Sequence, residues 1–193
     1  MIPRLPAKGT IRTWVKSQWK LRPLPGHFSV AINIADTTVN ERPSAADLAD
    51  IAVQTAEIAR RMGHDPRVAF LSYSNFGNPP GEWLATSRDA VALLDSRGAD
   101  FEYEGEMSPD VALNDEMKRH YPFSRLTAPA NVLIMPGLQS ASISAKLIKE
   151  LADGDSLGPF LVGMEKPVQI AGMTSTVSDL VTLGVLAAAG IVR

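Results

Sequence analysis

Short, almost continuous apolar runs alternate with helix-periodic segments along most of this chain. The runs include RVAFLSY at 67–73 and NVLIMP at 131–136, and each is followed by a turn and then by an amphipathic segment. Strands that consist of unbroken apolar runs are typical of a parallel sheet that is covered on both faces. The alternation therefore predicts an α/β fold, a three-layer α/β/α sandwich around a mainly parallel sheet.

The same pattern sets the expected boundaries. We expect strands at 28–35, 67–73, 100–107, 131–136 and 158–164. We expect helices at 44–62, 82–96, 138–151 and 176–189, with a loosely helical stretch at 108–120. Ser44 and Asp47 have capping-box spacing at the start of the first helix, and Gly63 ends it. In the second helix, Trp83, Ala90, Leu93 and Leu94 should face inward. Residues 1–27 show weak periodicity and are assigned to an N-terminal arm that precedes a domain at 28–193.

Composition excludes several classes of function. The formal net charge of −2, with both signs interspersed, gives no attraction to nucleic acid or acidic membranes. The absence of cysteine excludes disulfides, thiolate metal sites and a cysteine nucleophile. His27, His64 and His120 are scattered without the spacing of a metal pair, so no metal site is assigned. Without a secretory signal or a membrane-spanning apolar stretch, we expect a soluble, cytoplasmic protein.

Four polar loops are expected at one edge of the sheet. In an open α/β sheet, ligands bind beyond the carboxyl ends of the strands. The loops predicted there are SYSNFGNPPG, GEMSPD, MPGLQS and GMTSTVSD. In the first loop, Ser74, Asn75 and Gly77 could donate hydrogen bonds to a phosphate or carboxylate. Spacing alone favours an ordinary Gly/Pro turn, because the chain has no Walker or dinucleotide fingerprint.

Alternating carboxylates mark the strand around residue 104. Glu102, Glu104 and Glu106 fall on one side of an extended strand. Paired carboxylates could act as acid and base, but such alternation is more often a solvated face at a sheet edge, and we favour that interpretation. Gly105 indicates a bend or a close backbone approach.

The stretch KPVQIAGMTSTVSDL at 166–180 is typical of a strand that leads into a helix N-terminus. Thr176 and Asp179 have capping-box spacing, so Asp179 could satisfy the first-turn amides. Alternatively, Asp179 could be a general base that faces a bound thiol. A helix N-terminus stabilises a charged carboxylate and so weakens it as a base. The physical argument favours the cap.

Several segments, in the same order, resemble the phosphotransacetylase (phosphate acetyl/butyryltransferase) family. They include GEMSPDVALN, SRLTAPANVLIMPGLQSASISAKLIKEL and GPFLVGMEKPVQI. The resemblance is closest to the phosphotransacetylase-like C-terminal domain of bacterial NADP-dependent malic enzymes. It implies the α/β/α architecture of the isocitrate and isopropylmalate dehydrogenases and a homodimer or higher homo-oligomer. It also implies acetyl-CoA or a related acyl-CoA as a ligand and an upstream malic enzyme domain as a partner.

Two departures from the family pattern bear on activity. In active members, a Ser-Arg pair after Lys-Pro-Val holds the phosphoryl substrate, and a catalytic Asp follows it. In this chain, Gly172 and Met173 occupy the positions of the pair, and Asp179 occupies the position of the Asp. A methionine supplies neither the charge nor the bidentate geometry of a guanidinium. The match also corresponds to the second domain and terminal helix of the family, so the first domain, which forms the other wall of the cleft, is expected to lie outside it.

The resemblance carries a set of candidate residues over to this chain. Asp179 takes the catalytic position. The candidate ligand-binding residues are Ser74, Asn75, Gly77, Met135, Pro136, Lys166, Gly172, Met173 and Thr174.

Three functions follow as hypotheses. The first is a non-catalytic, acetyl-CoA-sensing regulatory and oligomerisation domain that needs no other cofactor. The second is an active phosphate acyltransferase that uses Asp179 as base, and the third is a purely structural assembly module. No nicotinamide-binding domain is visible, so this segment should not oxidise malate by itself.

Overall fold

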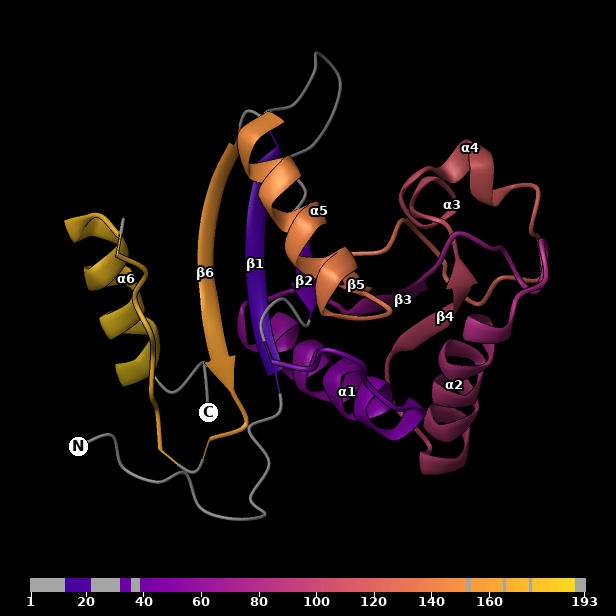
Figure 1. Ribbon diagram of the computed structural model, residues 1–193, viewed down its shortest axis with the longest axis horizontal. Helices are drawn as coiled ribbons and strands as arrows, with labels where there is room; N and C mark the ends of the chain where they lie inside the picture. The colour runs from indigo at the N-terminus through magenta and orange to yellow at the C-terminus, as the bar shows by residue number, and fades with distance from the viewer. Residues whose placement is uncertain are drawn as a thin grey trace.

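The computed structural model describes residues 13–21, 32–35, 39–151, 154–164, 166–173 and 175–189, and for 13–21 and 154–157 it describes the backbone alone. The strands are β1 (Thr13–Leu21), β2 (Asn33–Ala35), β3 (Arg67–Leu71), β4 (Glu102–Met107), β5 (Val132–Ile134) and β6 (Gly154–Val162). The helices are α1 (Ala45–Arg61), the 3-10 turn η1 (Glu82–Leu84), α2 (Ala85–Arg97), α3 (Pro109–Leu113), α4 (Asp115–Lys118), α5 (Leu138–Leu151) and α6 (Val177–Ala188). Figure 1 shows their arrangement.

The six strands within the described ranges form one sheet in the order β4-β3-β5-β2-β1-β6. β4, β3, β5 and β2 are parallel neighbours, whereas β1 runs antiparallel to both β2 and β6. The predicted mainly parallel sheet is therefore confirmed. β1 was not expected, because residues 13–21 fall in the segment that the sequence assigns to an arm. Its apolar residues are interrupted by polar ones, and strands far along the chain supply its pairing.

Helices cover both faces of the sheet, which gives the expected three layers. On one face, α1 and α2 pack against Phe70, Val132 and Ile134 in one buried cluster. On the other face, α3 and the first turn of α5 pack against Ala69, Leu133 and their neighbours in a second cluster. Both clusters include β3 and β5 because these central strands alternate their side chains between the two faces.

The caps of the first helix are those predicted. Ser44 is the N-cap of α1, its hydroxyl oxygen accepts a hydrogen bond from the Asp47 N–H, and the Asp47 carboxylate accepts one from the Ser44 N–H. Gly63, with a φ of +84°, follows the C-cap. The second helix differs from prediction at its start, because residues 82–84 form η1 and leave Trp83 78% exposed. Trp83 therefore does not face inward, although Ala90 and Leu94 are buried as expected.

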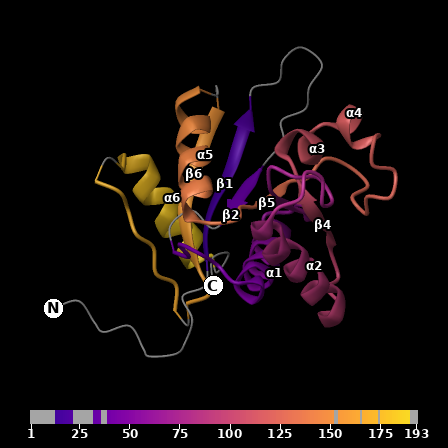
Figure 2. The same cartoon turned by 45° about the vertical axis from the view of Figure 1, so that its right-hand side comes forward.

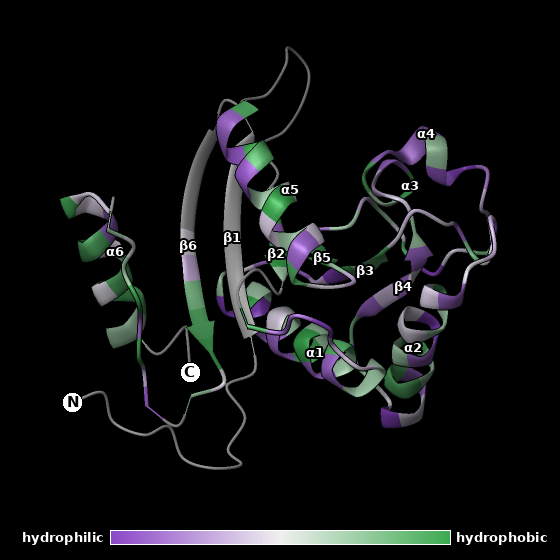
Figure 3. Ribbon diagram, viewed as in Figure 1, coloured by the Kyte–Doolittle hydropathy of each residue, from purple (hydrophilic) through white to green (hydrophobic). Residues whose placement is uncertain are grey.

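Two helices carry apolar side chains that the described chain leaves exposed. On α5 these are Ile143, Leu147 and Leu151, spaced four residues apart. On α6 they are Val177, Leu180, Val181 and Val185, while Leu183 packs into the core. Figure 3 shows apolar residues along α6 at the margin of the molecule. Among the described residues, no helix combines the length and the apolar character that crossing a bilayer requires.

Candidate functional site

Three of the four predicted polar loops meet at one edge of the sheet. They follow β3, β4 and β5, which are parallel neighbours, so their carboxyl ends point the same way. In Figure 2, α3 and α4 lie together beyond this end of β4. The fourth loop, at 172–179, does not directly follow a strand.

The loop between β3 and α2 is built around Glu106. The Ser74 hydroxyl and the Gly77 N–H both donate to Oε1 of this glutamate, at 3.2 and 2.7 Å. The Asn75 side-chain carbonyl accepts from the N–H and the hydroxyl of Ser108, at 2.7 and 2.9 Å. The structure therefore brings the predicted residues Ser74, Asn75 and Gly77 together, but with protein groups as their partners.

The glutamates of β4 are not a solvated face, so that expectation is wrong. Glu106 is fully buried and Glu104 is 7% exposed. The carboxylate of Glu104 accepts from the Arg125 N–H and Nε, at 3.0 and 3.3 Å. The Glu102 carboxylate accepts from the Thr127 N–H and hydroxyl, at 2.9 and 2.7 Å. The glutamates therefore fasten β4 to the loops beside it.

Arg88 is the cation that faces the buried carboxylate. Its Nε lies 3.6 Å from Oε2 of Glu106, and its own side chain is about half exposed. In the described part of the chain, Oε2 has no hydrogen-bond partner. The sequence does not point to Arg88, Ser108 or Arg125 as site residues, because their contacts join segments that are far apart along the chain.

A second charged group lies beside β4. Asp95 accepts hydrogen bonds from the Tyr103 hydroxyl and from Nη1 of Arg125, both at 2.6 Å. These bonds, Tyr103 first, hold the pKa of Asp95 below its ordinary value. Burial, and then the Asp95 carboxylate, raise the pKa of Tyr103. The guanidinium of Arg125 also stacks 4.7 Å from the Tyr103 ring centre, so this network holds α2, β4 and the 119–127 loop together.

Of the two predicted ligand-binding residues in the loop after β5, one is buried in the core and one is exposed. Met135 is 8% exposed and packs in the second core cluster, and its N–H donates to the Ala35 carbonyl at 2.9 Å. Pro136 is exposed. A Cβ at Gly137 would lie 3.0 Å from the Glu41 carbonyl oxygen, so this loop and the β2–α1 loop are in close contact.

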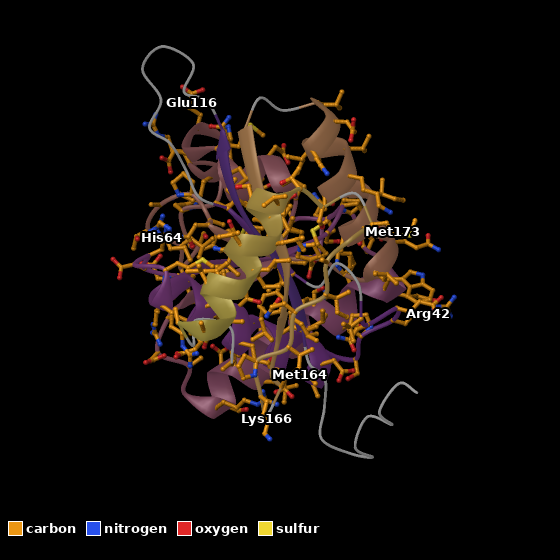
Figure 4. All side chains as sticks on the ribbon, turned by 90° about the vertical axis from the view of Figure 1, so that its left-hand side faces the viewer. Arg42, His64, Glu116, Met164, Lys166 and Met173 are labelled. Carbon is orange, nitrogen blue, oxygen red and sulfur yellow. The ribbon has the colours of Figure 1, made fainter. Side chains whose placement is uncertain are left out.

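The segment at 166–173 runs beside the outer edge of β6 and is not a strand in the described residues. The Gln169 side chain accepts from the Leu161 N–H and donates to the Leu161 carbonyl, both at 3.1 Å. Lys166 and Gly172 are exposed, and Met173 is 104% exposed. Figure 4 shows Lys166 and Met173 projecting from separate parts of the surface. Thr174 lies outside the described residues.

Asp179 forms the capping box that the sequence predicts. Its carboxylate accepts from the Thr176 N–H and hydroxyl at 2.8 and 2.9 Å, and its N–H donates to the Thr176 hydroxyl oxygen at 3.2 Å. The Thr176 bonds, backbone first, lower the pKa of Asp179, and the charge of Lys149 adds to this effect. Within the described residues the carboxylate has no ion pair. A lowered pKa makes it a weaker base.

The predicted residues fall into two groups in this chain. One group follows β3 and β5, and the other follows β6. Four strand steps separate β3 from β6, which is about 19 Å at ~4.8 Å per step. Among the described residues no group of three or more His, Asp or Glu side chains could hold a metal ion.

The three-layer fold with polar loops at the carboxyl edge of the sheet defines an α/β/α protein, a class in which ligands commonly bind at that edge. The chain belongs to the phosphate acetyl/butaryl transferase family, which matches residues 27–188. It is 49% identical over 176 residues to the NADP-dependent malic enzyme of Rhizobium meliloti, covering 86% of this chain and 23% of that enzyme. It is 38% identical over 151 residues to the phosphate acetyltransferase of Treponema pallidum, covering 76% and 45% of the two chains.

The fold is that of a phosphotransacetylase. A phosphotransacetylase from Streptococcus pyogenes superposes with a TM-score of 0.82 and 29% identity, over 94% of this chain and 55% of that one. The chain thus spans about a quarter of the malic enzyme and about half of the transferases. The expected resemblance to both groups of relatives is confirmed.

Proposed function

We propose that this chain is a cytoplasmic, non-catalytic domain that binds acetyl-CoA or a related acyl-CoA and organises the assembly of a malic enzyme. The observation that carries the proposal is at 173, where the family resemblance implies an arginine. The chain has methionine there, fully exposed, and the described residues form no ion pair with Asp179. Because residue 173 is not an arginine, this position cannot offer a phosphoryl group the bidentate clamp that would hold it for transfer.

The similarity to malic enzymes supports the regulatory part of the proposal. In the Rhizobium meliloti protein the matched region is a C-terminal part that covers 23% of the chain. The remaining length is available for the oxidoreductase itself. A domain of this kind would act by binding its ligand with different affinities in two states of the whole enzyme.

The test is a titration with acetyl-CoA. A ligand that binds the folded state raises the melting temperature, and at 100 times its Kd the gain is about 2.7 kcal/mol. We expect Lys166→Glu to weaken this shift, because an exposed lysine in the candidate site would meet the phosphates of CoA. Lys146→Glu, on the exposed surface of α5, serves as the matched control. If millimolar acetyl-CoA does not raise the melting temperature when the upstream malic enzyme domain is present, the proposal that this domain binds acetyl-CoA is contradicted.

A second candidate is an active phosphate acyltransferase, which the family match and the retained Asp179 favour. Its test is CoA-dependent phosphate release from acetyl phosphate, with Asp179→Ala as the control. Turnover that is lost in this variant would place the acyltransferase above the non-catalytic domain.

A third candidate, a purely structural module, is favoured by the exposed apolar residues of α5 and α6. It predicts a stable assembly that binds no acyl-CoA.

A further inference from the structure

The β3–α2 loop has the geometry of an anion-binding turn. Phe76 and Gly77 both have positive φ, at +52° and +90°. Asn75 and Asn78 exchange backbone hydrogen bonds at 3.0 and 3.1 Å, which closes the turn between them. Closed turns of this kind can aim N–H groups into a concavity where an anion binds. Here the Gly77 N–H and the Ser74 hydroxyl converge on one point.

That point is already occupied by a carboxylate of the same chain. Oε1 of Glu106 accepts both donors, at 2.7 Å from Gly77 and 3.2 Å from Ser74. The backbone carbonyl of Glu106 also accepts from the Phe76 N–H at 2.9 Å. The loop thus binds residue 106 through the side chain and the main chain together.

The second oxygen and the neighbouring cation complete the arrangement. Oε2 is buried and accepts no hydrogen bond from the residues that the structure describes, and Nε of Arg88 lies 3.6 Å away. Arg88 also covers the turn, because a Cβ at Gly77 would lie 3.3 Å from its Nη1. A buried carboxylate requires such a partner to remain charged. The guanidinium of Arg88 therefore pairs with the carboxylate of Glu106, a group of the same chain.

We propose that Glu106 is a built-in anion that fills the cradle of the β3–α2 loop, and that the loop is thereby closed to external phosphate and carboxylate. Ser74 and Gly77 then position the loop and do not contact ligand. The inference does not rest on the proposed function, since it concerns the protein without acyl-CoA. It predicts that the phosphates of any acyl-CoA bind elsewhere along the carboxyl edge.

The test compares Glu106→Ala with Glu102→Ala. Glu102 lies on the same strand but bonds to Thr127, so its loss leaves the cradle filled. In Glu106→Ala, the Gly77 N–H should exchange with solvent at least about tenfold faster than in wild type. Formate at 100 mM should bind in the vacated cradle and restore most of the protection. Formate should have no such effect on Glu102→Ala, and chloride should not replace formate.

Wild type provides a measurement that does not depend on the folding of a variant. Phosphate and formate titrations, followed by the amide NMR signal of Gly77, should leave that signal in place. A saturable shift there would overturn the proposal, as would unchanged Gly77 exchange in Glu106→Ala or a failure of formate to restore it. If Glu106→Ala does not fold, Glu106→Gln keeps an oxygen acceptor and should keep the Gly77 N–H protected. Loss of that protection in a folded Glu106→Gln would also contradict the assignment.

Discussion

Gly105 is a residue at which the sheet leaves no room for a side chain. A Cβ atom there would lie 2.7 Å from Cβ of Phe70 and 2.8 Å from the Phe70 carbonyl oxygen. Its φ of +155° is also one that residues with a side chain rarely adopt. The sequence predicts a bend or close approach at this glycine, and the structure confirms the close approach, to β3.

We predict that Gly105→Ala lowers the free energy of unfolding by about 3 kcal/mol, from overpacking together with backbone strain. Gly98→Ala is the control. Gly98 also has positive φ, at +65°, but a Cβ there would meet no atom within 4 Å, so its loss should be about 1 kcal/mol. Urea unfolding measures both. Equal losses at the two sites would contradict the steric argument.

The β4 glutamates show what a local pattern leaves out. Alternation assumes a regular strand, whereas the pairing of β4 with β3 skips Glu106 between Gly105 and Met107. The pattern also does not reveal what lies opposite each side chain. Their partners Ser74, Arg125 and Thr127 are between 21 and 32 residues away in sequence. Burial of a carboxylate depends on such long-range donors. The expectation of a solvated face therefore fails for Glu104 and Glu106.

At the scale of elements, the Asp95–Tyr103–Arg125 group ties α2 to β4 and to the following loop. Hydrogen bonds from Tyr103 and Arg125 hold the pKa of Asp95 below its ordinary value of 3.8. A carboxyl group with a depressed folded-state pKa stabilises the fold above its unfolded-state pKa. That stabilisation disappears as the pH falls below 3.8 and through the lower folded-state pKa.

Asp95→Asn should therefore be less stable than wild type at pH 7, and the difference should shrink as the pH falls below 4. Asp89→Asn, an exposed position on the same helix, should differ little from wild type at either pH. Urea midpoints at pH 7 and pH 3 measure both variants. A difference for Asp95→Asn that persists unchanged at pH 3 would show that its effect does not come from the carboxylate charge.

Elements whose signals are local could be predicted from the sequence. The capping boxes at Ser44 and Thr176 form as their spacing indicates, because both partners lie within one helical turn. β1 could not be predicted, because its conformation depends on β2 and β6. The stretch VQI at 168–170 has the composition of a strand, but in the described chain it bonds to β6 through the Gln169 side chain.

At the scale of the whole molecule, α5 and α6 both leave apolar side chains exposed in the described residues. Natural monomers rarely expose a contiguous apolar patch of more than a few hundred Å². A stable interface buries about 800 Å² per partner. The exposed Leu and Val side chains of these two helices are therefore the residues at which we test for an interface.

We predict that Leu147→Glu and Val181→Glu each weaken self-association of the chain or its docking to the upstream malic enzyme domain. Val53→Glu is the control, since Val53 is 41% exposed on α1 and lies beside Arg97 and Gly98 at the end of α2. Light scattering on size-exclusion chromatography measures the mass. If both variants keep the mass and the docking of wild type, or if Val53→Glu has an equal effect, the exposed residues of α5 and α6 do not form the interface.

The candidate site could be predicted only as a set of loops. Parallel strands place the 72–81, 105–110 and 135–140 loops at one edge, as the alternating pattern indicates. The sequence does not show that β1 and β2 separate β5 from β6, because β1 is not evident in it. Because β1 and β2 lie between β5 and β6, Lys166 and Met173, which follow β6, lie away from the loop that contains Ser74.

Gln169 occupies main-chain groups at an outer edge of the sheet. In the described residues, β6 is the last strand of the sheet, and the amide of Gln169 bonds to both main-chain groups of Leu161, at the apolar end of that strand. A strand from another molecule cannot pair there without first displacing this amide. We therefore expect this single polar side chain to hinder edge-to-edge pairing of β6 with a strand from another molecule.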